Sequence, residues 1–365
     1  MSPAHAATNP RWSILVPPAA LLLLATTWGR DLGWFPVVLV SVGVVAAVLT
    51  AVHHAEVVAL RVGEPFGTLI LAVAVTVIEV ALIVTLMISG GDKTASLARD
   101  TVFAAVMIAT GGIIGLSLLV GSIHHGEQRF RTEGSTGALA ALVALAVGSL
   151  VLPTFTSTTP GPTFSGAQLA YAGVSSLVLY GVFVFVQTIR HRDYFLPVDS
   201  RGMTDEDEHA AAPSNRTSLT SLGLLVACLV AVVGLAKVVS PAIEGGVRSV
   251  GAPSSAVGVV IALLVLAPET LAAVRAARRN RIQTSFNLAL GSALASIGLT
   301  IPVIGLASIW LEGPLVLGLE AKEMTLLALT VVVNMLTLNS GRASVLQGTV
   351  HLVVFSGFLF LAVSP

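Results

Sequence analysis

Eleven apolar runs, separated by charged or Gly- and Pro-rich breaks, dominate this chain of 365 residues. A helix of about 20 apolar residues crosses the hydrocarbon core of a membrane, so each run predicts a transmembrane helix. Only 10% of the residues are charged, whereas soluble domains carry about 25%. The sequence therefore predicts an all-α, polytopic membrane protein. The predicted helices cover residues 13–28, 34–52, 66–89, 102–123, 137–153, 168–189, 218–240, 255–274, 286–311, 323–338 and 347–363.

The loops between these runs differ in positive charge. On one side of the membrane they hold 13 of the 19 Lys and Arg residues, and on the other side they hold the remaining 6. Because cytoplasmic loops carry an excess of positive charge, this asymmetry predicts a cytoplasmic N-terminus and an external C-terminus. The first run lacks a clear small-residue cleavage site, so we expect it to be retained as a membrane span.

A polar segment over residues 190–217 divides the chain near its middle. It contains the acidic run Asp205–Glu208, and we expect a solvated cytoplasmic linker, with regulatory cation sensing as the alternative. Residues 1–33 form an N-terminal tail and an extra first helix, and five spans lie on each side of the linker, over 34–189 and 218–365. An odd number of spans per repeat turns the second repeat upside down, which predicts two inverted five-helix repeats.

Two glutamates lie deep within apolar runs, one in each half of the chain. Glu79 lies in LILAVAVTVIEVALIVTLMI and Glu269 in SSAVGVVIALLVLAPETLAAV. An ionised carboxylate at this depth costs about 2.5 kcal/mol or more, so such residues usually face a partner, a cavity or an ion path. Each glutamate lies in the second span of its repeat, and this symmetry predicts one shared site for cations and protons.

The spans that follow the two glutamates are rich in small and polar residues. Such residues usually serve helix packing, but some of their oxygens could join the carboxylates around a cation. The strongest candidate ligands are Asn287 and Ser292, followed by Thr76, which lies one helical turn before Glu79. The small and polar positions include Thr110, Gly111, Gly112, Gly115, Ser117, Gly291, Ser296, Gly298 and Thr300.

Other polar side chains carry weaker signals. The lone Cys228 and the lack of clustered His or Cys argue against a disulfide framework and a zinc site. His351 lies inside the last run, where both a hydrogen-bonded packing role and a proton relay stay open. The pairs His53–His54 and His124–His125 predict interfacial solvation. Acidic residues near helix ends are interpreted as solvated loop charges or as groups that recruit cations, and they are Glu56, Glu64, Asp92 and Asp100.

Two carboxylates with neutral oxygens are typical of a site for a hard cation. Ca²⁺ takes about six to eight oxygen ligands, and Na⁺ can use the same set. Desolvation and a second carboxylate both disfavour ionisation, so an empty pair tends to hold protons that an entering cation displaces. Because an empty charged site is costly to move, this competition predicts an H⁺-coupled cation antiporter. No cofactor is expected, and Ca²⁺, Na⁺ and H⁺ are the expected transported substrates.

Three stretches of the chain resemble a known family, and they are GEPFGTLILAVAVTVIEVALI, LAPETLAAVRAARRNRIQTSFNLALGSALASIGLTIP and MTLLALTVVVNMLTLNSGRASVLQGTVHLVVF. They are similar to the ChaA-type bacterial Ca²⁺/H⁺ and Na⁺/H⁺ antiporters, within the CAX-like part of the Ca²⁺:cation antiporter superfamily. The resemblance covers about residues 12–363 and implies an inner-membrane exporter of Ca²⁺, Na⁺ and K⁺ driven by inward protons. It also implies that Glu79 and Glu269 correspond to the paired acidic residues of the superfamily's two signature repeats.

The chain departs from the superfamily pattern at both signatures. Many proton-coupled members carry Gly-Asn-x-x-Glu, whereas Thr76 and Leu266 stand three residues before the two acids here. The missing amides leave room for a mainly monovalent Na⁺(K⁺)/H⁺ antiporter. Pro268 removes a helical backbone donor and predicts a kink beside Glu269.

Other classes of protein fit the sequence less well. The chain has no filter repeat of a passive cation channel, and no His-Glu-x-x-His motif or Ser/His pairing that would indicate a membrane-embedded enzyme. Its balanced charge and pI near 7 give no sign of nucleic-acid binding. We therefore expect the partners to be inorganic cations, protons and the lipid bilayer of a bacterial inner (plasma) membrane.

Overall fold

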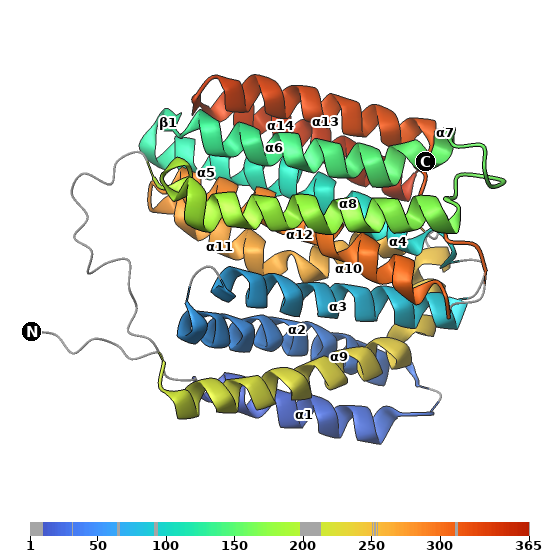
Figure 1. Cartoon of the computed structure of the whole chain (residues 1–365). Helices are drawn as coiled ribbons and strands as arrows, with labels where there is room; N and C mark the ends of the chain where they lie inside the picture. The colour runs from blue at the N-terminus through green and yellow to red at the C-terminus, as the bar shows by residue number, and fades with distance from the viewer. Residues whose placement is uncertain are drawn as a thin grey trace, which may run out of the picture. The chain divides into compact units, whose positions relative to one another are not determined.

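Helices make up nearly all of the structure, which is a computed structural model (Figure 1). It describes residues 10–30, 32–63, 66–90, 94–197, 213–249, 251, 253, 255–310 and 313–364. The elements of the first half are α1 (Arg11–Thr27), α2 (Trp34–Val62), α3 (Phe66–Gly90), α4 (Leu97–Met107), η2 (Ile108–Ile113), α5 (Ile114–His125), β1 (Gln128–Arg129), α6 (Thr132–Ala146), η3 (Val147–Val151), α7 (Leu152–Phe155), α8 (Gly166–Phe185), η4 (Val186–Arg190) and η5 (Arg192–Phe195). Those of the second half are α9 (Asn215–Ser249), α10 (Ser255–Val265), α11 (Ala267–Arg278), α12 (Ile282–Ala307), α13 (Ala321–Asn339), β2 (Arg342–Ala343) and α14 (Val345–Val363).

Each of the eleven predicted spans coincides with helical structure among the described residues. Within the part of the chain that the structure describes, nine spans are long and apolar enough to cross a membrane, α10 and α11 form a tenth that is bent by 52°, and α1 is a shorter apolar helix of 17 residues. The protein is therefore an all-α, polytopic membrane protein, as predicted. Several boundaries differ from the prediction. Helix α2 continues ten residues further and α9 continues to Ser249 rather than to 240, while α4 begins at Leu97 rather than at 102 and α6 begins at Thr132 rather than at 137.

The helices group into two compact units. The first unit contains α1, α2, α3 and most of α9, and the second contains the other described helices. This grouping does not follow the order of the chain, because α9 comes from the second half and joins the first three helices. Of the predicted linker, Arg190 ends η4 and residues 192–195 form η5, whereas residues 198–212, with the acidic run Asp205–Glu208, lie outside the described residues.

In the first unit, α1 packs against both α2 and α9 (Figure 1). Gly234 of α9 leaves space that the side chain of Leu24 fills. His54 is fully buried in α2, and its Nε2 atom lies 2.9 Å from the Ser13 carbonyl oxygen of α1. The prediction of interfacial solvation is therefore wrong for His54, because α2 does not end before this residue but carries it into the packing with α1.

In the second unit, α12 contacts α6, α8 and α11, while α14 packs on α5 and α10 packs on α4. The two faces of α8 differ as expected of a helix between lipid and protein. Tyr171, Val178 and Val182 are exposed on one face, whereas Tyr180 and Phe183 are buried on the other. Exposed aliphatic and aromatic side chains on a long apolar helix are suited to a hydrocarbon solvent. The exposed face of α8 thus has the composition expected of a transmembrane helix.

Two helices begin at capping boxes, and a short pair of strands joins two loops. Ser165 and Gln168 form a capping box at α8, and Ser344 and Gln347 form a second one at α14. In this motif the serine and the Gln three residues later bond each other's backbone N–H groups, which the helix itself leaves unpaired. Strand β1 pairs antiparallel with β2, so the loop after α5 is joined to the loop before α14.

Candidate cation-binding residues

Glu79 and Thr76 lie on the buried face of α3 in the first unit. Glu79 is 2% exposed and Thr76 is 5% exposed. Residues three positions apart share one side of a helix, so the hydroxyl and the carboxylate point in the same direction. Ile83 and Leu86 continue the same face and are also buried. Among the described side chains of this face, Thr76 and Glu79 thus lie with apolar neighbours, which suits a carboxylate that is kept from bulk water.

Glu269 lies at the bend between α10 and α11 in the second unit. Leu266 separates the two helices, Pro268 follows in the first turn of α11, and Glu269 lies in that same turn. Proline has no N–H group, so the carbonyl of Leu264 loses its helical donor. The predicted kink beside the acid is confirmed. A carboxylate in the first turn of a helix is also favoured by the helix dipole.

Asn287 lies near the start of α12 in a network of amide groups. Its Nδ2 atom donates to the Phe195 carbonyl at 2.6 Å, and its Oδ1 atom accepts from Gln283 Nε2 at 3.1 Å. Gln283 also accepts a hydrogen bond from the Arg131 backbone N–H at 2.8 Å. Both ends of the Asn287 amide are thus hydrogen-bonded. Asn287 ties η5 to α12, and Gln283 ties the start of α6 to the same helix. Ser292, further along α12, is partly buried.

His351 of α14 is buried in the second unit, at 1% exposure. Its Nδ1 atom lies 2.9 Å from the Thr110 carbonyl oxygen, and its Nε2 atom lies 3.1 Å from Thr337 Oγ1. Both ring nitrogens therefore contact neutral groups, as in the hydrogen-bonded packing role, which is one of the two roles that the sequence leaves open. A Cβ atom added at Gly115 would lie 2.8 Å from the His351 Cβ atom, so Gly115 serves the close packing predicted for the small residues of this span.

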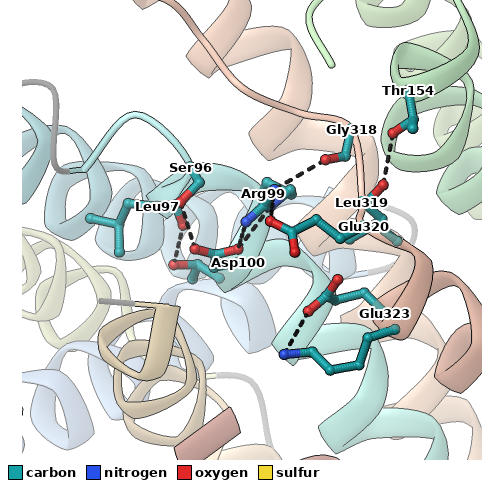
Figure 2. A network of polar contacts seen from close by, with 11 residues as sticks. Ser96, Leu97, Arg99, Asp100, Thr154, Gly318, Leu319, Glu320 and Glu323 are labelled. Atoms are coloured by element: carbon teal, nitrogen blue, oxygen red, sulfur yellow. Dashed lines mark hydrogen bonds and ion pairs between the residues drawn. The ribbon is translucent and has the colours of Figure 1, made fainter. Parts of the chain in front are cut away.

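The structure places a buried ion pair at the start of α4, where the sequence predicts that Asp100 is a solvated loop charge or a group that recruits cations. Figure 2 shows Arg99 and Asp100 in contact, with 2.8 Å between Arg99 Nη2 and Asp100 Oδ1. Their side chains are 9% and 8% exposed. Ser96 Oγ donates to Asp100, and Arg99 Nη1 donates to the Gly318 carbonyl at 3.1 Å. The solvated interpretation of Asp100 is wrong, because α10 and the segment before α13 cover this turn.

Sequence reasoning also missed a polar stripe on α13. Thr330, Asn334 and Thr337 are buried, at 3%, 0% and 3% exposure. Their spacing of four and three residues puts them on one face of the helix, and this spacing was the signal available in the sequence. Asn334 Nδ2 donates to the Thr330 carbonyl at 2.8 Å and lies 3.3 Å from the Thr110 carbonyl. The stripe therefore faces the same turn as His351.

Two full-length relatives and one solved structure are similar to the chain. The chain is 46% identical to y4hA of Sinorhizobium fredii (strain NBRC 101917 / NGR234), described as an ionic transporter, over 98% of this chain and 97% of that protein. It is 36% identical to the sodium-potassium/proton antiporter ChaA of Escherichia coli (strain K12), over 96% of each chain. The structure of native YfkE covers 97% of this chain and 99% of its own, with a TM-score of 0.73 at 16% identity, and so has the same fold.

The family comparison matches residues 32–189 and 220–364, which is most of the chain. The matched family is described as sodium/calcium exchanger protein. Both the match and the ChaA relative confirm the resemblance to ChaA-type antiporters of the Ca²⁺:cation antiporter superfamily. They also confirm the prediction of a transporter rather than an enzyme. The chain belongs to the sodium/calcium exchanger protein family and is a multi-pass membrane exchanger of cations.

Proposed function

We propose that the protein exchanges cytoplasmic Na⁺ or K⁺ for external protons through a site that contains Glu79 and Glu269. The observation that carries the proposal is the pair of acidic residues, one at depth in each half of the chain, in a member of an exchanger family. Glu79 is buried and Glu269 starts a bent helix, which are suitable surroundings for carboxylates that take up and release a charge. Thr76, Asn287 and Ser292 are the neutral oxygen ligands that the sequence suggests.

Proton coupling follows from competition for the carboxylates. Without a cation, carboxylates that share a desolvated site favour the protonated form, because desolvation and mutual repulsion both oppose charge. A bound cation replaces the protons and neutralises the site. Since the empty, ionised site is the most costly form to move through a membrane, the transporter changes its orientation mainly when the site holds either protons or a cation. The result is exchange by alternating access.

From the sequence alone Ca²⁺ is the first candidate substrate, but the following observations favour the monovalent cations. The ChaA relative is named as a sodium-potassium/proton antiporter. In this chain Thr76 and Leu266 stand where many proton-coupled members carry an amide. Asn287, the nearest replacement in the next helix, has both ends of its amide hydrogen-bonded elsewhere. Fewer oxygen ligands favour a cation that does not need the six to eight of Ca²⁺.

Ca²⁺ is the second candidate substrate, because two carboxylates can balance its double charge. The two candidates separate in a direct flux experiment on sealed everted vesicles that hold the full chain. An acid interior is established, Na⁺, K⁺ or Ca²⁺ is added outside, and loss of the pH gradient is followed. We expect Na⁺ and K⁺ to evoke alkalinisation at lower concentration than Ca²⁺. The reverse order would make Ca²⁺ the main substrate.

The same vesicles test the two glutamates. Glu79→Gln and Glu269→Gln should each abolish cation-evoked proton flux, because a neutral amide neither releases a proton nor balances a cation. Glu133→Gln is the matched control, since Glu133 is exposed in the first turn of α6, and it should behave as the unaltered protein. An unaltered protein that responds to none of the three cations would overturn the antiport proposal. An apparent cation affinity that does not change between about pH 6 and 9 would overturn the shared site.

A further inference from the structure

A π-helical turn interrupts the span from Leu97 to His125. This turn, η2, covers Ile108–Ile113, and all six residues are buried. The backbone N–H of Ile114, which ends the turn, donates to the Ala109 carbonyl, five residues back rather than the usual four. Such a turn changes the pairing of backbone carbonyls, and π-helical turns occur frequently at functional sites. In a membrane, every carbonyl released in this way needs a donor from the protein.

Two side chains from other helices meet at one carbonyl of this turn, that of Thr110. His351 Nδ1 of α14 lies 2.9 Å from the oxygen, and Asn334 Nδ2 of α13 lies 3.3 Å from it. Because a carbonyl oxygen only accepts, the imidazole proton must be on Nδ1. The orientation of Asn334 is fixed in the same way, since its Nδ2 atom also donates to the Thr330 carbonyl. A reversed amide would place its oxygen against two carbonyl oxygens.

The other ring nitrogen of His351 completes a neutral arrangement. With the proton on Nδ1, the Nε2 atom accepts from the hydroxyl of Thr337, 3.1 Å away. Charging this ring would place a cation among neutral partners at membrane depth, which is costly. The ionisable residues of the helices packed on α14 lie at helix ends, as His124 and His125 of α5 and Lys322 and Glu323 of α13, and Arg342 lies in β2, before the start of α14. Neither η2 nor α10, which also pack on α14, contains an ionisable residue.

The π-helical turn lies against the helix that carries Glu269. Within the second unit, α11 packs on α5, α12 and η2, and Glu269 occupies the first turn of α11. Gly115 lets α14 approach so closely that a Cβ atom there would lie 2.8 Å from the His351 Cβ atom and 3.1 Å from the Leu352 backbone nitrogen. The contacts at Thr110 therefore connect α13 and α14 to the surface on which α11 rests.

We propose that His351 and Asn334 are positioning residues, which hold the Thr110 carbonyl of η2 and thereby fix the π-helical turn against which the Glu269 helix packs. His351 acts as a neutral hydrogen-bond donor and carries no transported proton. This inference rests on the proposed function, because its effect on transport is an effect on the cation affinity of Glu269. It also decides between the two roles that the sequence left open for His351.

Two amide substitutions of His351 separate a donor from a proton carrier. In His351→Asn the amide nitrogen takes the place of Nδ1 and can still donate to Thr110, whereas in His351→Gln it takes the place of Nε2. Neither amide titrates. We expect His351→Asn to keep an apparent cation affinity close to that of the unaltered protein, and His351→Gln to weaken it by about tenfold, as expected for one buried hydrogen bond. The dependence of flux on pH should be unchanged in His351→Asn.

Equal loss of flux in His351→Asn and His351→Gln, in vesicles where the unaltered protein is active, would overturn the positioning role and favour a proton relay. A second measurement does not depend on transport. The ¹⁵N NMR spectrum of histidine-labelled full-length protein should show His351 as the neutral Nδ1–H tautomer between about pH 6 and 9, with assignment from the His351→Asn spectrum. An Nε2–H tautomer or an imidazolium would overturn the inference, whatever the result of the flux experiment. Conversely, if no cation evoked proton flux, that result by itself would remove only the proposed function.

Discussion

At the scale of single residues, burial rather than position in the helix decides whether a charged side chain needs partners within the protein. Asp100 and Glu133 both lie in the first turn of a helix, yet Asp100 is 8% exposed and ion-paired while Glu133 is exposed. The difference is that Arg99 and Ser96 supply donors and that α10 covers the turn. A buried carboxylate is tolerated only when such partners are present.

The ion pair gives a prediction about stability. Arg99→Met should lower the free energy of unfolding by about 3–5 kcal/mol, because it leaves the carboxylate of Asp100 buried without its cation. The double variant Arg99→Met/Asp100→Asn should lose less than Arg99→Met alone, since no unpaired charge remains. The measurement is reversible unfolding of the purified protein in mixed micelles.

An exposed ion pair is the control for this comparison. Arg129 Nε lies 3.8 Å from Glu127, with side chains 75% and 45% exposed. Arg129→Met should change stability by no more than about 1 kcal/mol, because water screens exposed pairs. Asp100→Asn is also measured alone. If the decreases in the free energy of unfolding of Arg99→Met and Asp100→Asn simply added in the double variant, the two residues would not be energetically coupled.

At the scale of helices, glycine determines which pairs of elements can touch. Gly258 of α10 lies against α4, and a Cβ atom there would lie 2.8 Å from the Thr101 backbone nitrogen and 2.9 Å from the Asp100 carbonyl carbon. These are backbone atoms of a buried helix and cannot rotate away. The contact between α10 and α4 therefore depends on the missing side chain.

Gly258→Ala should lower the free energy of unfolding by about 1–3 kcal/mol, the usual cost of overpacking. Gly181→Ala in α8 is the matched control, because a Cβ atom at Gly181 meets nothing within 4 Å. We expect that control to be neutral or to stabilise the helix by up to about 1 kcal/mol, since alanine has the higher helix propensity. Thermal unfolding of both variants in detergent checks the prediction. If Gly258→Ala and Gly181→Ala had equal effects, α10 would be able to move away from α4 without loss of stability.

The positions of the helices are predicted well from the sequence. Of the interruptions within them, the bend at Leu266 is predicted and the π-helical turn η2 is not. Each span follows from the length of apolar chain that a bilayer requires, and the bend at Leu266 follows from the backbone chemistry of Pro268. The π-helical turn η2 was not predicted, because its residues also suit an ordinary helix and the turn depends on donors that lie 224 and 241 residues away. Likewise, His54 is buried by α1, which the local sequence of α2 does not reveal.

At the scale of the whole molecule, the distribution of positive charge is the main guide to orientation. It predicts a cytoplasmic N-terminus and an external C-terminus. Alkaline phosphatase fused after residue 365 should therefore be active, and green fluorescent protein at the same place should be dark. A fusion in the loop between α13 and α14, which holds Arg342, is the control and should show the opposite pattern. Reversed results at both positions would invert the proposed direction of exchange.

The packing of α14 also bears on how the chain is made. Thr110 and His351 are 241 residues apart in sequence, so at a synthesis rate of about 5–20 residues per second the carbonyl waits tens of seconds for the imidazole. Until then, α14 does not cover Gly111, Gly112 and Gly115 of η2 and α5, against which it packs in the final structure. The second unit consequently reaches its final form only after α14 has been made, and a ribosome that stalls after α13 leaves an incomplete core for the quality-control machinery of the membrane to detect.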